Sequence, residues 1–396
     1  MAVAEGMVRQ ALVVRGGALG RDTGLGAAHA GVVRLLASGE IEGWTLAGEV
    51  EHREGGFAPW RLMRRWWRHP KRVRRALRSR AKDDASTVML VSDQEHAHLV
   101  PKRRIRGLRT AVVVHDLFAL APRTIELSDG VMKEFDERIG PVRWLDLRRL
   151  RRGLRRADLL ICVSEATRQR CAEVFPKVDT VHVPSGVNLS RYAPNEPDVH
   201  GPPGGCALLV VGNDHARKRM DFLARVLTAC PEEVRADLHL IRVGGGQTDA
   251  GRRALRTAME WADVRLTLRD RIEEEELQAL RLRCEALLFP SVAEGYGYPP
   301  VEAMAAGLPV LASDMPNHGS MVHPSCLLPV DDVEAWVDRI CDLHATWTLR
   351  TEAGTHWEPR VPDEALMAHA ALYSTEAQAV ELKRALDGLL QGEPGR

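Results

Sequence analysis

Two kinds of hydrophobic pattern alternate along most of the chain. Short runs rich in β-branched residues lie at 11–14, 88–91, 111–114, 159–163 and 180–183, and amphipathic helical patterns separate them. Buried strands that alternate with helices are typical of βαβ units, whose strands pair in parallel. The first half of the chain therefore predicts an α/β domain.

A second series of the same kind follows a break at 192–205, which is rich in Pro and Gly and lacks periodicity. Strands are expected at 207–211, 238–243, 286–289 and 309–312, with helices near 218–230, 249–262, 273–284 and 299–306. We therefore expect an α/β fold of two doubly wound, Rossmann-like domains, 1–195 and 206–350, that face each other across a cleft. Ligands of such domains bind at the carboxyl ends of the strands.

Composition narrows the class of protein. The 396 residues, 45% hydrophobic and 28% charged, exclude a disordered chain, and the net charge of +1 argues against a surface built for nucleic acid. Seven cysteines without a CxxC pair indicate reduced thiols. We find no signal-peptide pattern and no run of about 18 apolar residues, so we expect a cytoplasmic protein without a membrane span.

Basic residues gather in two segments. Residues 61–82 hold eleven Lys or Arg and no acid, with Trp60, Trp66 and Trp67 close by, and 143–156 hold seven Arg and one Asp. Two interpretations stay open: solvated amphipathic helices, or a face for anionic lipid, nucleic acid or a phosphorylated acceptor. The centre of the candidate face is Arg64, Arg65, Trp66, Trp67 and Arg68.

The stretch 289–310 is the most informative for chemistry. A strand ends near Pro290, a Gly-rich loop contains Glu294, and Pro299 stands where a helix would begin. The backbone N–H groups of 295–298 and the helix N-terminus suit a diphosphate. Glu294 can accept hydrogen bonds from sugar hydroxyls, and Glu302 can bind a second polyol such as ribose.

Glu294 and Glu302, in EGYGYPPVEAMAAG, resemble the signature of retaining GT-B glycosyltransferases of family 4, the group 1 glycosyltransferases. The similarity continues, in the family's order, through 157–167, 183–188, 210–219, 240–246 and 275–280, and covers residues 10–345. It implies the GT-B fold. The segment 357–390 resembles the closing helices that pack back onto the N-terminal domain.

The resemblance assigns Arg217 and Lys218 to the donor diphosphate, whose negative charge grows as the glycosidic bond breaks. Physics supports this role, because cations at a helix start oppose the helix dipole unless an anion is present. The remaining donor contacts are expected at Gly212, Asn213, Gly295, Tyr296, Gly297, Tyr298 and Glu302. The chain departs from the family at Asn213, where an Arg is frequent, and at 317–321.

In the N-terminal half, the resemblance indicates a donor-binding loop at Gly24 and Gly26, with Gly16 and Gly17 as the alternative. It places His115 near the reacting centre with Asp116 beside it, although a structural, hydrogen-bonded His is the other interpretation.

Ser164 and Glu165 either lie on the cleft floor, as the resemblance implies, or Ser164 is the N-cap of a helix at 165–175.

The implied activity is metal-independent transfer of a sugar, with retention, from a UDP- or GDP-sugar to an unidentified acceptor hydroxyl. We expect no metal and no cofactor beyond this co-substrate, since the sequence has no Asp-X-Asp triplet. Contact with the inner face of an anionic membrane stays open as a partner interaction, because the basic segments have two interpretations; a nucleic-acid partner is not expected. The alternatives are a nucleotide-sugar 2-epimerase and an inactive protein that binds membrane or nucleic acid.

Overall fold

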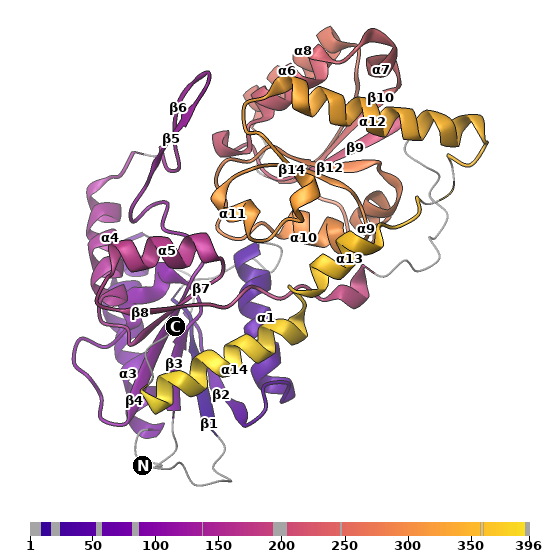
Figure 1. Ribbon diagram of the computed structural model, residues 1–396. Coiled ribbons are helices and arrows are strands. Elements are labelled where there is room, and N and C mark those ends of the chain that lie inside the picture. The colour runs from indigo at the N-terminus through magenta and orange to yellow at the C-terminus, as the bar shows by residue number, and fades with distance from the viewer. Residues whose placement is uncertain are drawn as a thin grey trace. The chain divides into compact units, whose positions relative to one another are not determined.

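The computed structural model describes residues 9–16, 24–52, 58–80, 87–136, 138–192, 204–245, 248–356, 358 and 360–392. These divide into two compact units. Unit 1 comprises Met1–Arg123, Phe135–Gly186 and Thr375–Arg396, and unit 2 comprises Thr124–Glu134 and Val187–Ser374. Each unit has its own parallel sheet, as the alternating pattern predicts (Figure 1).

The sheet of unit 1 has the strand order β2-β1-β3-β4-β7-β8. Its strands are β1 (Arg9–Val14), β2 (Trp44–Val50), β3 (Thr87–Val91), β4 (Leu108–Val114), β7 (Leu159–Cys162) and β8 (Asp179–His182). The five strands expected from apolar runs are present. The edge strand β2 was not predicted, because most of its side chains are only half-buried and its sequence contains no apolar run.

Helices cover both faces of this sheet. They are α1 (Gly24–Ser38), α2 (Ala58–Met63), η1 (Arg64–Arg68), α3 (His69–Arg80), η2 (Gln94–Leu99), α4 (Pro141–Leu154), α5 (Glu165–Val174) and α14 (Thr375–Gln391). One core packs α3, α4 and α5 against one face of the strands. The side chains of α1 and α14 meet the other face around Val113 and Ile161.

The sheet of unit 2 has the order β11-β10-β9-β12-β13-β14. The strands are β9 (Cys206–Val211), β10 (Leu238–Val243), β11 (Arg265–Arg269), β12 (Ala286–Phe289), β13 (Val310–Ser313) and β14 (Leu327–Leu328). The helices are η3 (Leu189–Arg191), η4 (Ala216–Lys218), α6 (Met220–Ala229), α7 (Glu232–Asp237), α8 (Asp249–Ala262), α9 (Glu274–Arg283), α10 (Tyr298–Ala305), α11 (Pro316–Gly319), η5 (Pro324–Cys326), α12 (Val333–Glu352) and α13 (Glu364–Ala371).

Two segments belong to a different unit than their place in the chain suggests. The hairpin of β5 (Thr124–Leu127) and β6 (Gly130–Lys133) follows unit 1 strands but belongs to unit 2, where the Ser128 N–H donates to Asp331 at 2.7 Å and Asp129 pairs with Arg225. Within the expected closing segment 357–390, only α14 belongs to unit 1, because α13 packs on α10 of unit 2.

Among the described residues, none of the helices has the length and apolarity needed to cross a bilayer. All seven cysteines are free, and six of them are buried. Buried, unpaired thiols agree with the expectation of reduced cysteines.

Candidate functional site

The carboxyl ends of β9 and β10 are held close together by glycine. Gly212 follows β9 and Gly244 follows β10, and both have positive φ, +156° and +152°. A Cβ atom on Gly244 would lie 2.2 Å from the carbonyl oxygen of Gly212, so only glycine fits there. The loop 212–219 therefore leaves β9 in close contact with the end of β10, and β12 pairs with the other edge of β9.

Three residues predicted from the sequence come together where this loop meets the segment after β12. Arg217 Nη1 lies 2.8 Å from Glu294 Oε2, and Lys218 Nζ lies 2.5 Å from Glu294 Oε1. All three side chains are largely buried. The backbone ties the same segments together, since the Val292 N–H donates to the Arg217 carbonyl at 2.9 Å.

The charges of this cluster do not balance. Burial raises the pKa of Glu294, but the positive charges of Lys218 and Arg217 outweigh that effect and lower it to about 2. Glu294 is therefore a carboxylate at neutral pH and also accepts a hydrogen bond from Ser291 Oγ at 2.5 Å. Two cations face one carboxylate, and the remaining positive charge suits a phosphate group.

The helix predicted after the Gly-rich loop is α10, which begins at Tyr298 with prolines in its first turn. Gly297 precedes it with φ +103°, a conformation that favours glycine. Tyr296 is buried, its ring lies 4.9 Å from that of Tyr298, and its hydroxyl has no partner among the described residues. The helix begins where the sequence predicts it, and contact of this loop with a diphosphate stays a prediction.

Glu302 on α10 has a partner that the sequence did not reveal. Arg281 Nη2 lies 2.5 Å from Glu302 Oε2, and its other terminal nitrogen lies 2.8 Å from Glu274. The Arg281 guanidinium also stacks over the Tyr192 ring at 5.0 Å. Burial raises the pKa of Glu302 and Arg281 opposes the rise. Arg281 thereby fixes the carboxylate expected to bind ribose. In the sequence, the pairing could have been suspected only from an arginine at a buried position of α9.

Two further buried polar residues border the same strand ends. Arg242 on β10 is 1% exposed and pairs with Asp214, which follows Asn213 in the loop after β9. His318 in α11 is also buried, and its Nδ1 donates to the Ser313 carbonyl at 2.7 Å. The His318 ring lies 5.2 Å from that of Phe289. Both residues lie in or against the two loops that depart from the family pattern.

In unit 1, His115 lies at the end of β4 as predicted, and it is buried. Its backbone N–H donates to Gln94 Oε1 at 2.9 Å, and its Nε2 lies 3.3 Å from the Ser92 carbonyl. Burial lowers the pKa of His115, so the ring is neutral. Burial raises the pKa of the neighbouring Asp116 to about 6. These contacts are those of a structural histidine, and a role at the reacting centre stays a prediction.

Ser164 is the N-cap of α5 and its Oγ accepts from the Thr167 N–H at 3.2 Å, which confirms the capping interpretation. Glu165 pairs with Arg168 at 2.6 Å. The favourable pairing with Arg168 lowers the pKa of Glu165. A contact of either residue with substrate stays a prediction.

The N-terminal glycines are only partly described. Helix α1 begins at Gly24, which is exposed, and Gly26 is buried in its first turn. A Cβ atom on Gly16 would lie 2.8 Å from the His96 ring, so Gly16 permits close packing there. Gly17 lies outside the described residues.

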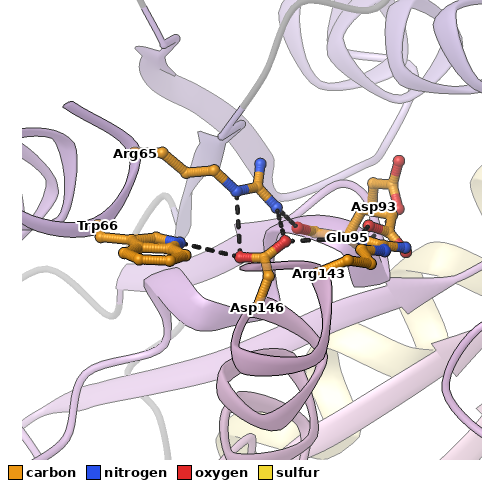
Figure 2. Close-up of polar contacts among 6 residues, drawn as sticks. All are labelled: Arg65, Trp66, Asp93, Glu95, Arg143 and Asp146. Atoms are coloured by element: carbon orange, nitrogen blue, oxygen red, sulfur yellow. Dashed lines mark hydrogen bonds and ion pairs between the residues drawn. The ribbon is translucent and has the colours of Figure 1, made fainter. Parts of the chain in front are cut away.

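The candidate basic face separates into inner and outer side chains. Figure 2 shows Arg65 and Trp66 directed at Asp146 of α4, with Trp66 Nε1 3.1 Å from Asp146 Oδ1 and Arg65 Nη2 3.0 Å from Oδ2. Trp67 and Arg68 are exposed, and Arg64 is half-buried. Arg65 and Trp66 thus attach η1 to α4.

One group of possible metal ligands was not anticipated. Donor atoms of His29, Glu49 and Glu51 in unit 1 lie within 4.8 Å of one another, and His29 Nε2 is 2.7 Å from Glu49. Burial and the neighbouring Glu51 raise the pKa of Glu49 to about 7. The group shares no residue with the Arg217, Lys218 and Glu294 cluster.

Comparison with known proteins places the chain in a family. Residues 33–191 match the model of Glycosyltransferase Family 4, and residues 205–346 match that of Glycosyl transferases group 1. The chain is 34% identical over 80 residues to the O-antigen chain mannosyltransferase RfbU of Salmonella typhimurium, a match that covers 20% of this chain and 23% of RfbU. It is 29% identical over 199 residues to the phosphatidyl-myo-inositol mannosyltransferase of Mycobacterium leprae, covering 48% and 50% of the two chains.

The chain is also 24% identical over 284 residues to the serotype-specific mannosyltransferase WbdA of Escherichia coli. This longer match covers 68% of this chain and 31% of WbdA. The matches span at most half the length of these three curated relatives.

Solved structures share the fold at low sequence identity. The sucrose-phosphate synthase of Thermosynechococcus elongatus has a TM-score of 0.67 at 18% identity, covering 97% of this chain and 100% of that one. Anabaena Alr3699/HepE in complex with UDP and glucose has a TM-score of 0.63 at 13% identity, covering 96% and 100%. The chain therefore belongs to the group 1, family 4-like glycosyltransferases, and it has their GT-B fold of two Rossmann-like domains.

Proposed function

We propose that the protein is a retaining glycosyltransferase that transfers a hexose from a UDP- or GDP-sugar to an acceptor hydroxyl. The observation that carries the proposal is the cluster of Arg217, Lys218 and Glu294, beside the loop that leads into α10. The cluster has one positive charge in excess, at the carboxyl ends of parallel strands, where nucleotides bind in such folds.

The relatives and neighbours support the choice of substrates. Three relatives are named as mannosyltransferases, and one structural neighbour holds UDP and glucose. The buried, unpaired cysteines agree with a reaction in the reducing cytoplasm.

The proposed reaction needs stabilisation of a leaving group more than a protein base. The bond between the anomeric carbon and the diphosphate oxygen breaks, and the acceptor oxygen bonds to that carbon on the same face. The acceptor's proton passes to the departing phosphate oxygen. Arg217 and Lys218 would neutralise the charge on this oxygen without a metal, aided by the N-terminus of α10.

Glu294 has two tasks in this scheme. Its carboxylate holds the two cations in place, and in the bound state it accepts hydrogen bonds from the sugar hydroxyls. Glu302, oriented by Arg281, would bind the ribose hydroxyls.

A thermal-shift screen against UDP, GDP, ADP, dTDP and CDP tests the donor site, because a ligand that binds only the folded state raises its stability. We expect one nucleotide to raise the Tm of the wild type and of Lys177→Ala, an exposed control, but not that of Lys218→Ala. An equal shift in Lys218→Ala would contradict the assignment.

Nucleotide sugars that contain the responding nucleotide are then tested as donors with a panel of hydroxyl acceptors. NMR gives the anomeric configuration of the product. Retention supports the proposal. Inversion contradicts it, and conversion of the nucleotide sugar without an acceptor would identify an epimerase.

A further inference from the structure

Exposed hydrophobic side chains gather on one part of unit 1. Six large ones, each 37% to 53% exposed, lie on α2, on η1, or within and just before the first turns of α4. They are Trp60, Trp67, Ile139, Val142, Trp144 and Leu145. They make up half of the exposed large hydrophobic side chains among the described residues. Monomeric proteins rarely expose such clusters without an interaction to cover them.

The segments that bear these side chains form one surface. Asp146 of α4 binds Arg65 and Trp66 of η1 (Figure 2). The Arg149 guanidinium of α4 also lies over the Trp66 ring, 4.4 Å from its centroid. We call α2, η1 and residues 139–149 the aromatic surface.

A cavity of about 440 Å³ opens within the aromatic surface. Its apolar walls are Leu62, Trp66, Pro141 and Val142, and the polar side chains that complete it are Arg65, Arg143 and Asp146. Every lining residue belongs to unit 1.

The polar side chains of the cavity already bind one another or Glu95 outside it. Asp146 accepts from Arg65 through both oxygens, at 3.3 and 3.0 Å, and from Trp66 and Arg143 as well. Arg143 in turn binds both oxygens of Glu95 at 2.7 and 2.9 Å. A sugar would have to compete with these bonds for partners. The wall that remains is apolar and suits a hydrocarbon chain.

The aromatic surface also pairs arginine with tryptophan. Arg68 lies over the Trp60 ring at 5.0 Å, and Arg148 lies over the Trp144 ring at 4.5 Å. Tryptophan favours the boundary between headgroups and hydrocarbon, and a neighbouring guanidinium can bind lipid phosphates. The segment 61–82 adds further basic residues and no acid. The surface therefore complements an anionic membrane rather than a neutral one.

We propose that the aromatic surface docks on an anionic lipid bilayer, with the exposed tryptophans at headgroup depth and one lipid hydrocarbon chain in the cavity. The proposal goes beyond the transferase reaction and does not depend on it, because unit 1 alone supplies every residue involved.

Co-sedimentation of the full chain with vesicles tests the docking. We expect binding to vesicles of phosphatidylcholine with phosphatidylglycerol, weakening with salt, and little binding to phosphatidylcholine alone. The double variant Trp67→Ser, Trp144→Ser should reduce binding by ~10-fold. Trp261→Ser with Leu349→Ser, which removes two exposed apolar side chains of unit 2, should bind as the wild type does. Equal binding by the two double variants would overturn the docking surface.

Calorimetric titration with monomeric short-chain phosphatidylglycerol tests the cavity. We expect saturable binding that Val142→Asp lowers by ~10-fold or more, since it places a charge in an apolar wall. Val142 is half-exposed in the first turn of α4, where Asp is favourable for the helix. The matched control Val380→Asp, on α14, should retain binding.

Absence of saturable lipid binding, or binding of free mannose that Val142→Asp abolishes, would overturn the assignment of the cavity to a hydrocarbon chain. Lys218→Ala should bind vesicles as the wild type does, because Lys218 lies in unit 2. Either proposal, docking or transfer, can therefore fail while the other stands.

Discussion

The two units each contain a cluster of basic side chains and carboxylates, partly buried in unit 1 and largely buried in unit 2, and the clusters differ in how their charges are paired. In unit 1, Arg65 pairs with Asp146 and Arg143 pairs with Glu95, so each guanidinium has a carboxylate partner, and Trp66 also donates to Asp146 (Figure 2). In unit 2, Arg217 and Lys218 share the single carboxylate of Glu294. A cluster in which each cation has its own carboxylate attaches one helix to another. A cluster with more cations than carboxylates can bind an anion as well.

The largest expected effect comes from neutralising the carboxylate of unit 2. Glu294→Gln leaves two buried cations without a counter-charge, which costs on the order of 3 kcal/mol of folding stability. Chemical denaturation at pH 7 measures it. Transfer activity should also fall by ~100-fold, because Arg217 and Lys218 lose their fixed positions. A variant with wild-type stability and activity would contradict the charge assignment.

The same variant gives a pH signature. The pKa of Glu294 in the folded protein, about 2, lies below its ordinary value of 4.5. Its contribution to stability is therefore complete above pH 4.5 and is lost as the pH falls toward 2. The stability difference between wild type and Glu294→Gln should shrink over this range, and a constant difference would contradict the ion pairs.

A smaller effect is expected for Asp146→Asn in unit 1. The amide still accepts some hydrogen bonds but removes the negative charge, at an expected cost of about 2 kcal/mol. Thermal unfolding measures the loss. Nucleotide binding by unit 2 should be unchanged, so a loss of nucleotide affinity equal to that of Lys218→Ala would show that the two clusters are not independent.

The smallest effect concerns how Glu302 is oriented. Arg281→Met removes the partner at 2.5 Å and should raise the KM for the nucleotide sugar by ~10-fold while kcat changes less, since ribose lies away from the reacting bond. Arg256→Met, on the exposed face of α8, is the control. A fall in kcat without a change in KM would place Arg281 in the chemical step instead.

The central strands of both sheets could be predicted because buried parallel strands are continuous apolar runs. The edge strands β2 and β11 could not, since half-buried and polar positions interrupt them. The hairpin of β5 and β6 belongs to unit 2, where it contacts Asp331 and Arg225, and these residues are too distant in the chain for a local pattern to reveal the contact.

The candidate site shows the same limit. Local spacing indicated Glu294 and Glu302, because the strand, loop and helix around them are contiguous, and the family resemblance added Arg217 and Lys218. The sequence did not reveal that Arg281 pairs with Glu302 or that Asp146 pairs with Arg65. The partners lie 21 and 81 residues apart in the chain. Sequence patterns report local structure, whereas the pairing of buried charges is decided by tertiary packing.

The most direct test of the unbalanced cluster is calorimetric titration of wild type and Lys218→Ala with the nucleoside and with the nucleoside diphosphate of the responding base. The account predicts that the wild type binds the diphosphate at least ~10-fold more tightly than the nucleoside, and that the difference largely disappears in Lys218→Ala. Equal preference for the diphosphate in both proteins would contradict the claim that Arg217, Lys218 and Glu294 form the diphosphate site.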